Sequence, residues 1–272
     1  MKSKNFRKSQ NLLRFALILF STIAVTPLYG QKLIDTSYEG VKQVYITIPK
    51  GSCEINSGGT VLRVQLNAES ADKIVPIYAL KKVGDTLRIT QQSHTGSVQN
   101  YRPVWTITVP SHIDVFMRTG NGTLKIRNAS LDITTEIGKG DIILEQVEGS
   151  FNLKTANGNI AVDGLKIRGS TAFKASKGDC KIRLKENPEH DLVVSSVTGN
   201  VTLNLNHFDF QGLVKVTLSS KSKFVTDLKS TQTKSYTPSG TRELLTEQWI
   251  QIGQKTNQLL LSTDIGTVTL LK

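Results

Sequence analysis

The chain has 272 residues and a formal net charge of +12, from 34 basic and 22 acidic side chains. Apolar residues make up 38% of it and aromatic residues 6%. No stretch beyond residue 30 is long and apolar enough to span a bilayer, which excludes a transmembrane segment from that part of the chain. Helices are not expected either, because no long stretch repeats apolar residues at the helical spacing.

The first thirty residues predict a signal peptide, which we assign to residues 1–30. Five basic and no acidic residues precede a largely apolar run of 11 residues, Phe15 to Val25, and Pro27 and Gly30 follow it. This order is typical of a secretory leader; an uncleaved N-terminal anchor is the alternative. Removal of the leader leaves 29 basic and 22 acidic residues, a net charge of +7. The sequence therefore predicts an exported protein that is periplasmic, on the cell surface or secreted.

Residues 31–110 are interpreted as irregular β coils or a small antiparallel cap. They contain strand-like runs such as Val61–Val64 and Thr86–Ile89. Between residues 60 and 103 these runs share no register with the pattern that dominates the rest of the chain. Terminal coils of a repeat protein need atypical caps, because an open end exposes strand edges and core.

A twelve-residue template recurs between Val44 and Leu270. Relative to an origin glycine, 26 of the 28 residues at positions −7, −5, +2 and +4 of seven copies are apolar. A spacing of two is the period of a half-buried strand, so each copy is predicted to be a strand, a turn and a strand. The origin is always glycine, as expected where the turn needs a positive φ: Gly51, Gly122, Gly140, Gly158, Gly178, Gly199 and Gly266.

The spacing of the copies favours a solenoid. The five central origins are 18, 18, 20 and 21 residues apart, joined by connections of variable length. We therefore predict an all-β fold, a parallel β-solenoid (single-stranded β-helix) with coils of about 18–21 residues over residues 111–272. A series of antiparallel hairpins is the alternative, since pairs such as Asn121-Gly122 favour hairpin turns. The polar and basic stretch 219–243 is expected to be a loop or insertion before the last coil.

The run Trp105 to Pro110, with Ile113, Val115, Met117 and Thr119 to Gly122 after it, resembles a family of bacterial β-strand-repeat proteins known as putative adhesins. This family is a domain of unknown function related to the head domains of auto-transporter adhesins, and the resemblance covers roughly residues 40–270. It implies right-handed coils, in agreement with the usual sense of parallel crossovers. It also implies adhesion, and it carries over no catalytic residues.

The two cysteines are predicted to be buried, unpaired thiols. Cys53 and Cys180 both occupy the inward position two residues after an origin glycine. They lie several coils apart, whereas a disulfide needs Cα atoms within about 7 Å. We expect them to pack as small apolar side chains.

No metal or cofactor is expected. The four histidines, at positions 94, 112, 190 and 207, are not spaced as metal ligands usually are. Asp141 and Asp179 follow origin glycines and suggest calcium at first sight. The position alternates with Thr and Asn, however, and Lys139 and Lys177 stand nearby, so a hydrogen bond within the turn is the preferred interpretation.

One surface cluster is a candidate for catalysis. Position +5 of four successive copies holds Arg127, Glu145, Asp163 and Arg183, which coil stacking would bring together on the outer face. Two carboxylates flanked by arginines could serve a glycan-active lyase or hydrolase. Charge pairing across coils explains the same residues, so we predict that the protein is not an enzyme.

The leading functional hypothesis is an exported adhesin or envelope-binding module that offers an extended β surface. A basic exported protein can attract anionic glycans or other envelope components, and another protein is a further possible partner. Nucleic acid is not expected outside the cytoplasm. The alternatives are a glycan-active β-helix enzyme and a periplasmic scaffold or sensory partner.

Overall fold

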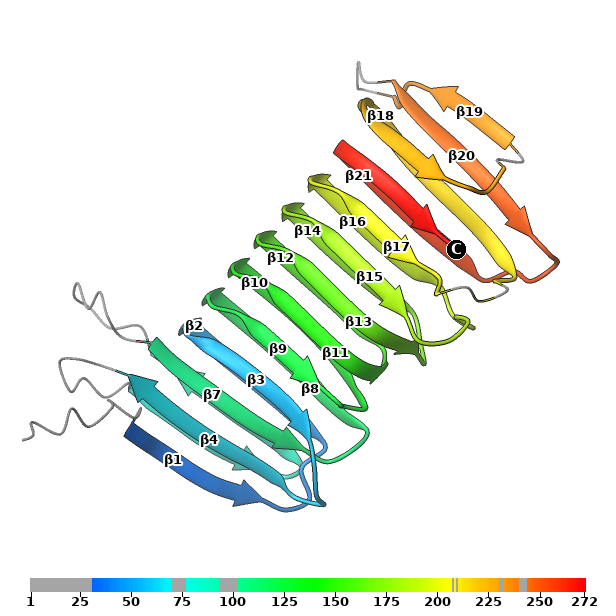
Figure 1. Cartoon of the computed structure of the whole chain (residues 1–272). Helices are drawn as coiled ribbons and strands as arrows, with labels where there is room; N and C mark the ends of the chain where they lie inside the picture. Colours follow the sequence, from blue (N-terminus) through cyan, green and yellow to red (C-terminus); the bar gives the residue numbers. More distant parts are fainter. Residues whose placement is uncertain are drawn as a thin grey trace, which may run out of the picture.

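A computed structural model describes residues 31–69, 77–92, 102–206, 208, 210–229, 232–239 and 244–272. The predicted signal peptide and the histidines at 94 and 207 lie outside the described residues. Within these ranges the protein is all β, with 21 strands in one long sheet and no helix that is long and apolar enough to cross a membrane. The strands stack along one axis (Figure 1).

The strands have the following bounds: β1 Gln31–Tyr38, β2 Gln43–Lys50, β3 Ser52–Ser57, β4 Leu62–Glu69, β5 Tyr78–Val83, β6 Thr86–Gln91, β7 Arg102–Val109, β8 Ile113–Asn121, β9 Leu124–Arg127, β10 Leu131–Lys139, β11 Ile142–Gly149, β12 Phe151–Asn157, β13 Ile160–Ile167, β14 Thr171–Lys177, β15 Cys180–Leu184, β16 Leu192–Thr198, β17 Val201–Asn204, β18 Gly212–Thr226, β19 Gln232–Tyr236, β20 Leu245–Ile252 and β21 Gln258–Leu271.

The coils form two facing walls. In the middle of the molecule, β8, β10, β12, β14 and β16 pair in parallel and make the first wall. The strands that follow each turn, β9, β11, β13, β15 and β17, pair in parallel and make the second wall. Equivalent residues of successive coils are partners, as in Met117 with Thr135. This register confirms a β-solenoid repeat in place of antiparallel hairpins.

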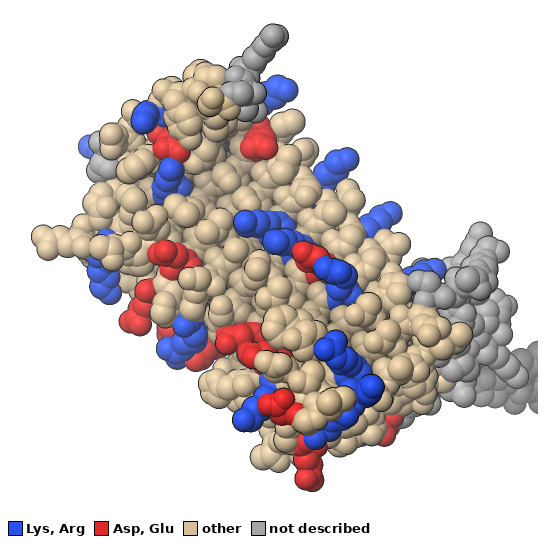
Figure 2. Space-filling view, turned by 180° about the vertical axis from the view of Figure 1, so that it is seen from behind, with Lys and Arg blue, Asp and Glu red and all other residues tan. Residues whose placement is uncertain are grey.

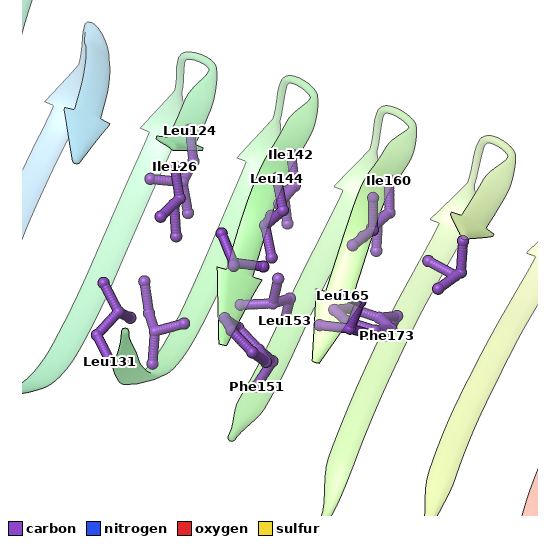
Figure 3. Close-up of a cluster of buried hydrophobic side chains, with 14 of the residues drawn as sticks. Leu124, Ile126, Leu131, Ile142, Leu144, Phe151, Leu153, Ile160, Leu165 and Phe173 are labelled. Carbon is purple, nitrogen blue, oxygen red and sulfur yellow. The ribbon is translucent and has the colours of Figure 1, made fainter. Parts of the chain in front are cut away.

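The core lies between the walls and follows the predicted positions. All 28 side chains at positions −7, −5, +2 and +4 of the seven copies are buried, the two threonines included. They form ladders from coil to coil, and Figure 3 shows several of these columns. The largest members, Phe151 and Phe173, stack with ring centroids 6.4 Å apart. Truncating such a side chain typically costs 3–5 kcal/mol, roughly half of a modest domain's total stability.

A fifth inward column, at position −3, was missed because it is mostly polar. It holds Thr119, Thr155, Ser196 and Thr263 together with apolar residues in other coils, and all four are buried. Three of the hydroxyls donate hydrogen bonds to the carbonyl oxygen of an origin glycine one coil before, as from Thr155 to Gly140 at 3.0 Å. These bonds satisfy polar groups that burial would otherwise penalise. They also tie three strands, β12, β16 and β21, to the turn of the preceding coil.

Part of the predicted connecting loops is strand. β11 and β13 continue past position +5, and Val147, Leu165 and Ile167 are buried there. A second corner begins at position +6, where Gln146 has a φ of 53° and Gly164 a φ of 74°. The alternating pattern shifts by one residue at this left-handed corner, which hid the extra strand from a period-two count.

The N-terminal end of the solenoid is interleaved. The strands β2 and β3 pair in parallel with β8 and β9 on one side and with β6 and β7 on the other. The coil formed by β2 and β3 is therefore second in the stack although it comes first in the chain, and the coil formed by β6 and β7 lies outside it. Antiparallel strands close this end, with β5 on β6, β4 on β7, and β1 on the outer edge of β4. Residues 60–103 thus contribute both a coil in register and a cap.

The C-terminal end of the solenoid is interleaved in the same way. The last strand, β21, pairs in parallel with β16 and β17 on one side and with β18 on the other. The loop expected from residue 219 begins later, because Lys221–Thr226 are the second half of β18 and pair with Ile265–Leu270. The polar side chains of this half belong to an outermost strand, where lysines suit an exposed edge.

Antiparallel strands complete the C-terminal cap. β20 pairs with the first half of β18, and β19 pairs with β20. Glu247 on β20 is buried and accepts hydrogen bonds from Tyr236 at 3.0 Å and from Trp249 at 3.3 Å. Lys215 lies 2.8 Å from the same carboxylate. This network fixes the cap to the first wall.

Candidate binding surfaces

The seven origin glycines form one column at the turn between the walls. Their φ values lie between 135° and 157°, a region that other residues rarely adopt. A Cβ on Gly140 would collide with the carbonyl oxygen of Gly122 in the preceding coil. The column is therefore a structural feature of close coil stacking.

The residues after these glycines form a hydrogen-bonded ladder. The carboxylate of Asp141 accepts the backbone N–H of Asn159 at 2.7 Å, and the amide oxygen of Asn159 accepts the N–H of Asp179 at 2.9 Å. Asp179 accepts the N–H of Asn200 at 2.7 Å. The sequence suggested bonds within each turn, and the structure shows bonds to the next coil. No group of three or more potential metal ligands occurs within the described ranges.

Cys53 and Cys180 are free and buried, which confirms the predicted unpaired thiols. Burial raises the pKa of each to about 12. A thiolate is therefore scarce at neutral pH, and neither side chain is suited to nucleophilic chemistry. Both act as core residues of their coils.

The predicted surface cluster is brought together on the outer face of the second wall. Glu145 is the register partner of Arg127 and of Asp163, and Asp163 is the partner of Arg183. Arg127 Nε donates a hydrogen bond to Glu145 Oε2 at 2.8 Å, and Arg183 forms an ion pair with Asp163. The order along the column is thus basic, acidic, acidic, basic. Each carboxylate pairs with the arginine next to it, Glu145 with Arg127 and Asp163 with Arg183.

A groove runs beside this column. Its volume is about 550 Å³, and the five strands β11, β13, β15, β17 and β21 contribute to it. Outward-facing Ile143 and Ala161 give it an apolar floor, while its sides are lined by Lys181 and by three residues of the cluster, Glu145, Asp163 and Arg183. We call it the second-wall groove. A shallow trough across several coils suits an extended ligand better than a compact one.

The electrostatics at Asp163 do not favour a general acid at this position. The hydrogen bond from Arg183, with the charges of Arg183 and Lys181, lowers the pKa of Asp163, although partial burial opposes the shift. A glycoside hydrolase needs one carboxylic acid whose pKa is raised. The arrangement can instead hold charged and polar groups of a ligand between fixed ion pairs.

A second outward feature, on the first wall, was missed at the sequence level. Arg88, Tyr45 and Phe116 are register partners on β6, β2 and β8. The rings of Tyr45 and Phe116 stack with centroids 4.7 Å apart and planes at 13°, and the Arg88 guanidinium lies 4.8 Å from the tyrosine centroid. The three residues come from three coils whose order in space differs from their order in the chain, so no spacing in the sequence relates them.

A charged row runs beside this stack on the same wall. Arg118, Glu136, Lys154 and Lys174 are successive register partners on β8, β10, β12 and β14. Arg118 binds Glu136 at 3.1 Å. Lys154 and Lys174 are exposed neighbours, an arrangement that costs free energy by charge repulsion. In the sequence these four residues all occupy position −4 of the repeat, an outward position that a pattern of apolar residues does not mark.

Comparison with known proteins identifies the family. The Toastrack DUF4097 family model matches residues 37–226, and the chain belongs to this family. This confirms the predicted family of bacterial β-repeat proteins. No protein in the curated collection matches.

Two solved structures match the chain at low similarity. One is a putative cell adhesion protein from Clostridium sporogenes, with 12% identity over 88% of this chain and 99% of that chain and a TM-score of 0.35. The other is a putative adhesin from Bacteroides fragilis, with 12% identity over 88% of this chain and 96% of that chain and a TM-score of 0.42.

Proposed function

We propose that this protein is an exported, non-enzymatic binding module of the cell envelope with an adhesin-like role. The second-wall groove carries the proposal, because it spans five strands and joins an apolar floor to fixed charged pairs. A linear polymer can lie along such a trough and contact one coil after another. The basic balance of the exported chain favours an anionic glycan or another envelope component as the partner. We also propose right-handed coils, the sense that parallel crossovers take.

The proposal is tested by blocking the groove. Ala161 is exposed on the groove floor, so Ala161→Trp fills the trough without entering the core. We expect this variant to lose binding to envelope polymer fractions and to whole cells. Ala79→Trp, at an exposed position of β5, is the matched control and should bind normally. Equal binding by both variants would remove the groove from the proposal.

Location separates adhesion from a periplasmic role. Adhesion requires a surface that protease can reach on intact cells, whereas a periplasmic scaffold or sensory partner is protected until the envelope is opened. We expect the chain in the envelope fraction and accessible to protease on intact cells. Recovery from the cytoplasm would contradict export, and protection in intact cells would favour the periplasmic role.

The glycan-active enzyme is the second candidate, and one observation favours it: Glu145 and Asp163 are direct neighbours across two coils. Such a carboxylate pair could act on a glycan in the groove. Glu145→Gln and Asp163→Asn keep the shape of the site and remove the charges. If a glycan-cleaving activity of the protein persists in both variants, this site is not catalytic.

A further inference from the structure

The stack on the first wall is open at one end. Arg88 covers the outer face of Tyr45, and Tyr45 covers one face of Phe116. The next partner of Phe116, on β10, is Thr134, whose small side chain cannot continue the stack. The second face of the Phe116 ring is therefore turned toward a gap above Thr134.

This gap is a formed cavity. It has a volume of about 300 Å³ and is lined by Tyr45, Thr47, Phe116, Arg118, Thr134 and Glu136 and by the neighbouring core residues Ile46 and Met117. One side is an aromatic face, and the other sides offer a hydroxyl, a guanidinium and a carboxylate. A ring with an apolar face and hydrogen-bonding edges fits these walls, since aromatic faces favour flat apolar contact and the polar groups fix orientation. We call this cavity the Phe116 slot.

The surroundings of the slot are basic on one side. Lys154 and Lys174 continue the row of Arg118 and Glu136, and no ion pair of either lysine is found among the described residues. Lys139 and Lys177 lie at the turn ends of β10 and β14, two strands of the same wall. Figure 2 shows this wall from outside, with basic side chains across its middle and along one margin and most acidic ones toward the opposite margin.

We propose that the Phe116 slot and the lysine row form a binding site for an acidic glycan. A pyranose ring lies on the open face of Phe116, and its hydroxyls bond Thr134, Arg118 and Glu136. The carboxylates of the following sugars lie over Lys154 and Lys174, where they relieve the repulsion between the two ammonium groups. The glycan thus runs along the solenoid axis, parallel to the coil stack.

This site is distinct from the second-wall groove, because the two lie on opposite walls. It goes beyond the proposed function by assigning an acidic glycan to a separate surface, the first wall, with named contacts. The failure of one does not imply the failure of the other, since Ala161→Trp changes only the groove, and the variants at Phe116, Thr134, Lys154 and Lys174 change only the first wall.

The test uses isothermal titration of the purified protein with an oligogalacturonate and with a neutral maltooligosaccharide of equal length. We expect the acidic oligomer to bind more tightly and its affinity to fall as salt is raised, because the lysine contacts are screened. Phe116→Ala should weaken binding about three- to tenfold, the effect of losing one aromatic contact. The double variant Lys154→Ser/Lys174→Ser should weaken it further and reduce the salt dependence.

Two controls keep the test decisive. Thr134→Phe fills the slot and extends the stack, so it should abolish ring binding while the thermal unfolding of the protein remains as in the wild type or rises. Lys125→Ser on the second wall should bind like the wild type. Equal affinity for acidic and neutral oligomers, or unchanged binding in both Phe116→Ala and Thr134→Phe, would overturn the proposal. Binding to vesicles of anionic lipid without binding to oligogalacturonate would overturn it as well.

Discussion

The consecutive coils in the middle of the molecule and the interleaved coils at its ends use the same inward positions but a different order of strands. In the middle, each coil stacks on the one before it in the chain. At the N-terminal end β2 lies between β6 and β8 on the first wall, and β3 lies between β7 and β9 on the second wall. At the C-terminal end β21 lies between β17 and β18. The earliest full coil and the last strand are thus held on both sides.

The difference teaches how a solenoid can end without fraying. A terminal coil that has only one neighbour can open at a small cost in free energy, because few contacts are lost. Here the terminal segments of the repeat region are interior in space, and antiparallel caps occupy the outermost places. Closing the ends requires pairing of distant segments, which slows folding and raises cooperativity.

Removal of β21, which holds the interleaved C-terminal end, should destabilise the protein most. A chain that ends at Asn257 loses the buried side chains of Leu259, Leu261, Val268 and Leu270. At about 1.5–3 kcal/mol for each, the loss is comparable to the stability of a whole domain. We expect no cooperative unfolding by circular dichroism and rapid proteolysis. A control that ends at Leu270 lacks only exposed residues and should melt like the full chain; similar melting of both truncations would show that β21 is dispensable.

A glycine in the middle tests how tightly consecutive coils stack. Gly140→Ala places a methyl group against the Gly122 carbonyl at a φ of 142°. We expect the free energy of unfolding to fall by about 2–4 kcal/mol in urea titrations. Gly59→Ala, at a φ of 72° with open space around it, should cost about 1 kcal/mol. Equal losses would mean that the coil contact contributes nothing beyond backbone strain.

The two thiols report on burial at one end and in the middle of the solenoid, since Cys53 lies on interleaved β3 and Cys180 on central β15. Each thiol has a folded pKa of about 12 against a usual value of 9.0. Below pH 9 both folded and unfolded states keep the proton and stability is complete. Between pH 9 and 12 only the unfolded state loses it, so stability falls by about 1.4 kcal/mol per pH unit for each cysteine.

Substitution of either thiol by valine should therefore flatten the decline. We expect Cys53→Val and Cys180→Val to reduce the alkaline slope equally in denaturant titrations at several pH values. A smaller effect for Cys53→Val would show that the interleaved end is more open than the middle. No effect for either variant would contradict the burial of the thiols.

Loss of an exposed ion pair on the outer face of the second wall should have the smallest effect. A double-mutant cycle on Arg127→Ala and Glu145→Ala removes one exposed ion pair of the middle coils. We expect a coupling free energy of about 0.2–1 kcal/mol that shrinks in high salt. A larger value that salt does not change would mean that the ion-pair ladder, and not the buried columns, sets the regular stacking of the middle.

The sequence by itself determined the repeating part of this protein. The period of two, the spacing of the glycines and the inward place of both cysteines are local properties, because stacked coils put equivalent residues in equivalent surroundings. The register that joins Arg127, Glu145, Asp163 and Arg183 followed for the same reason. The polar column at position −3 was missed because hydroxyls such as that of Thr155 are buried through bonds to the backbone, which an apolar count ignores.

Only the tertiary structure decided the order of coils at the ends and the surfaces that depend on it. Tyr45 and Phe116 are 71 positions apart, and they stack because β2 lies beside β8. The strand in residues 221–226 likewise depends on β21, which arrives later in the chain. Parallel pairing requires no turn between partners, so nothing near these residues in the sequence records which strand will lie beside them.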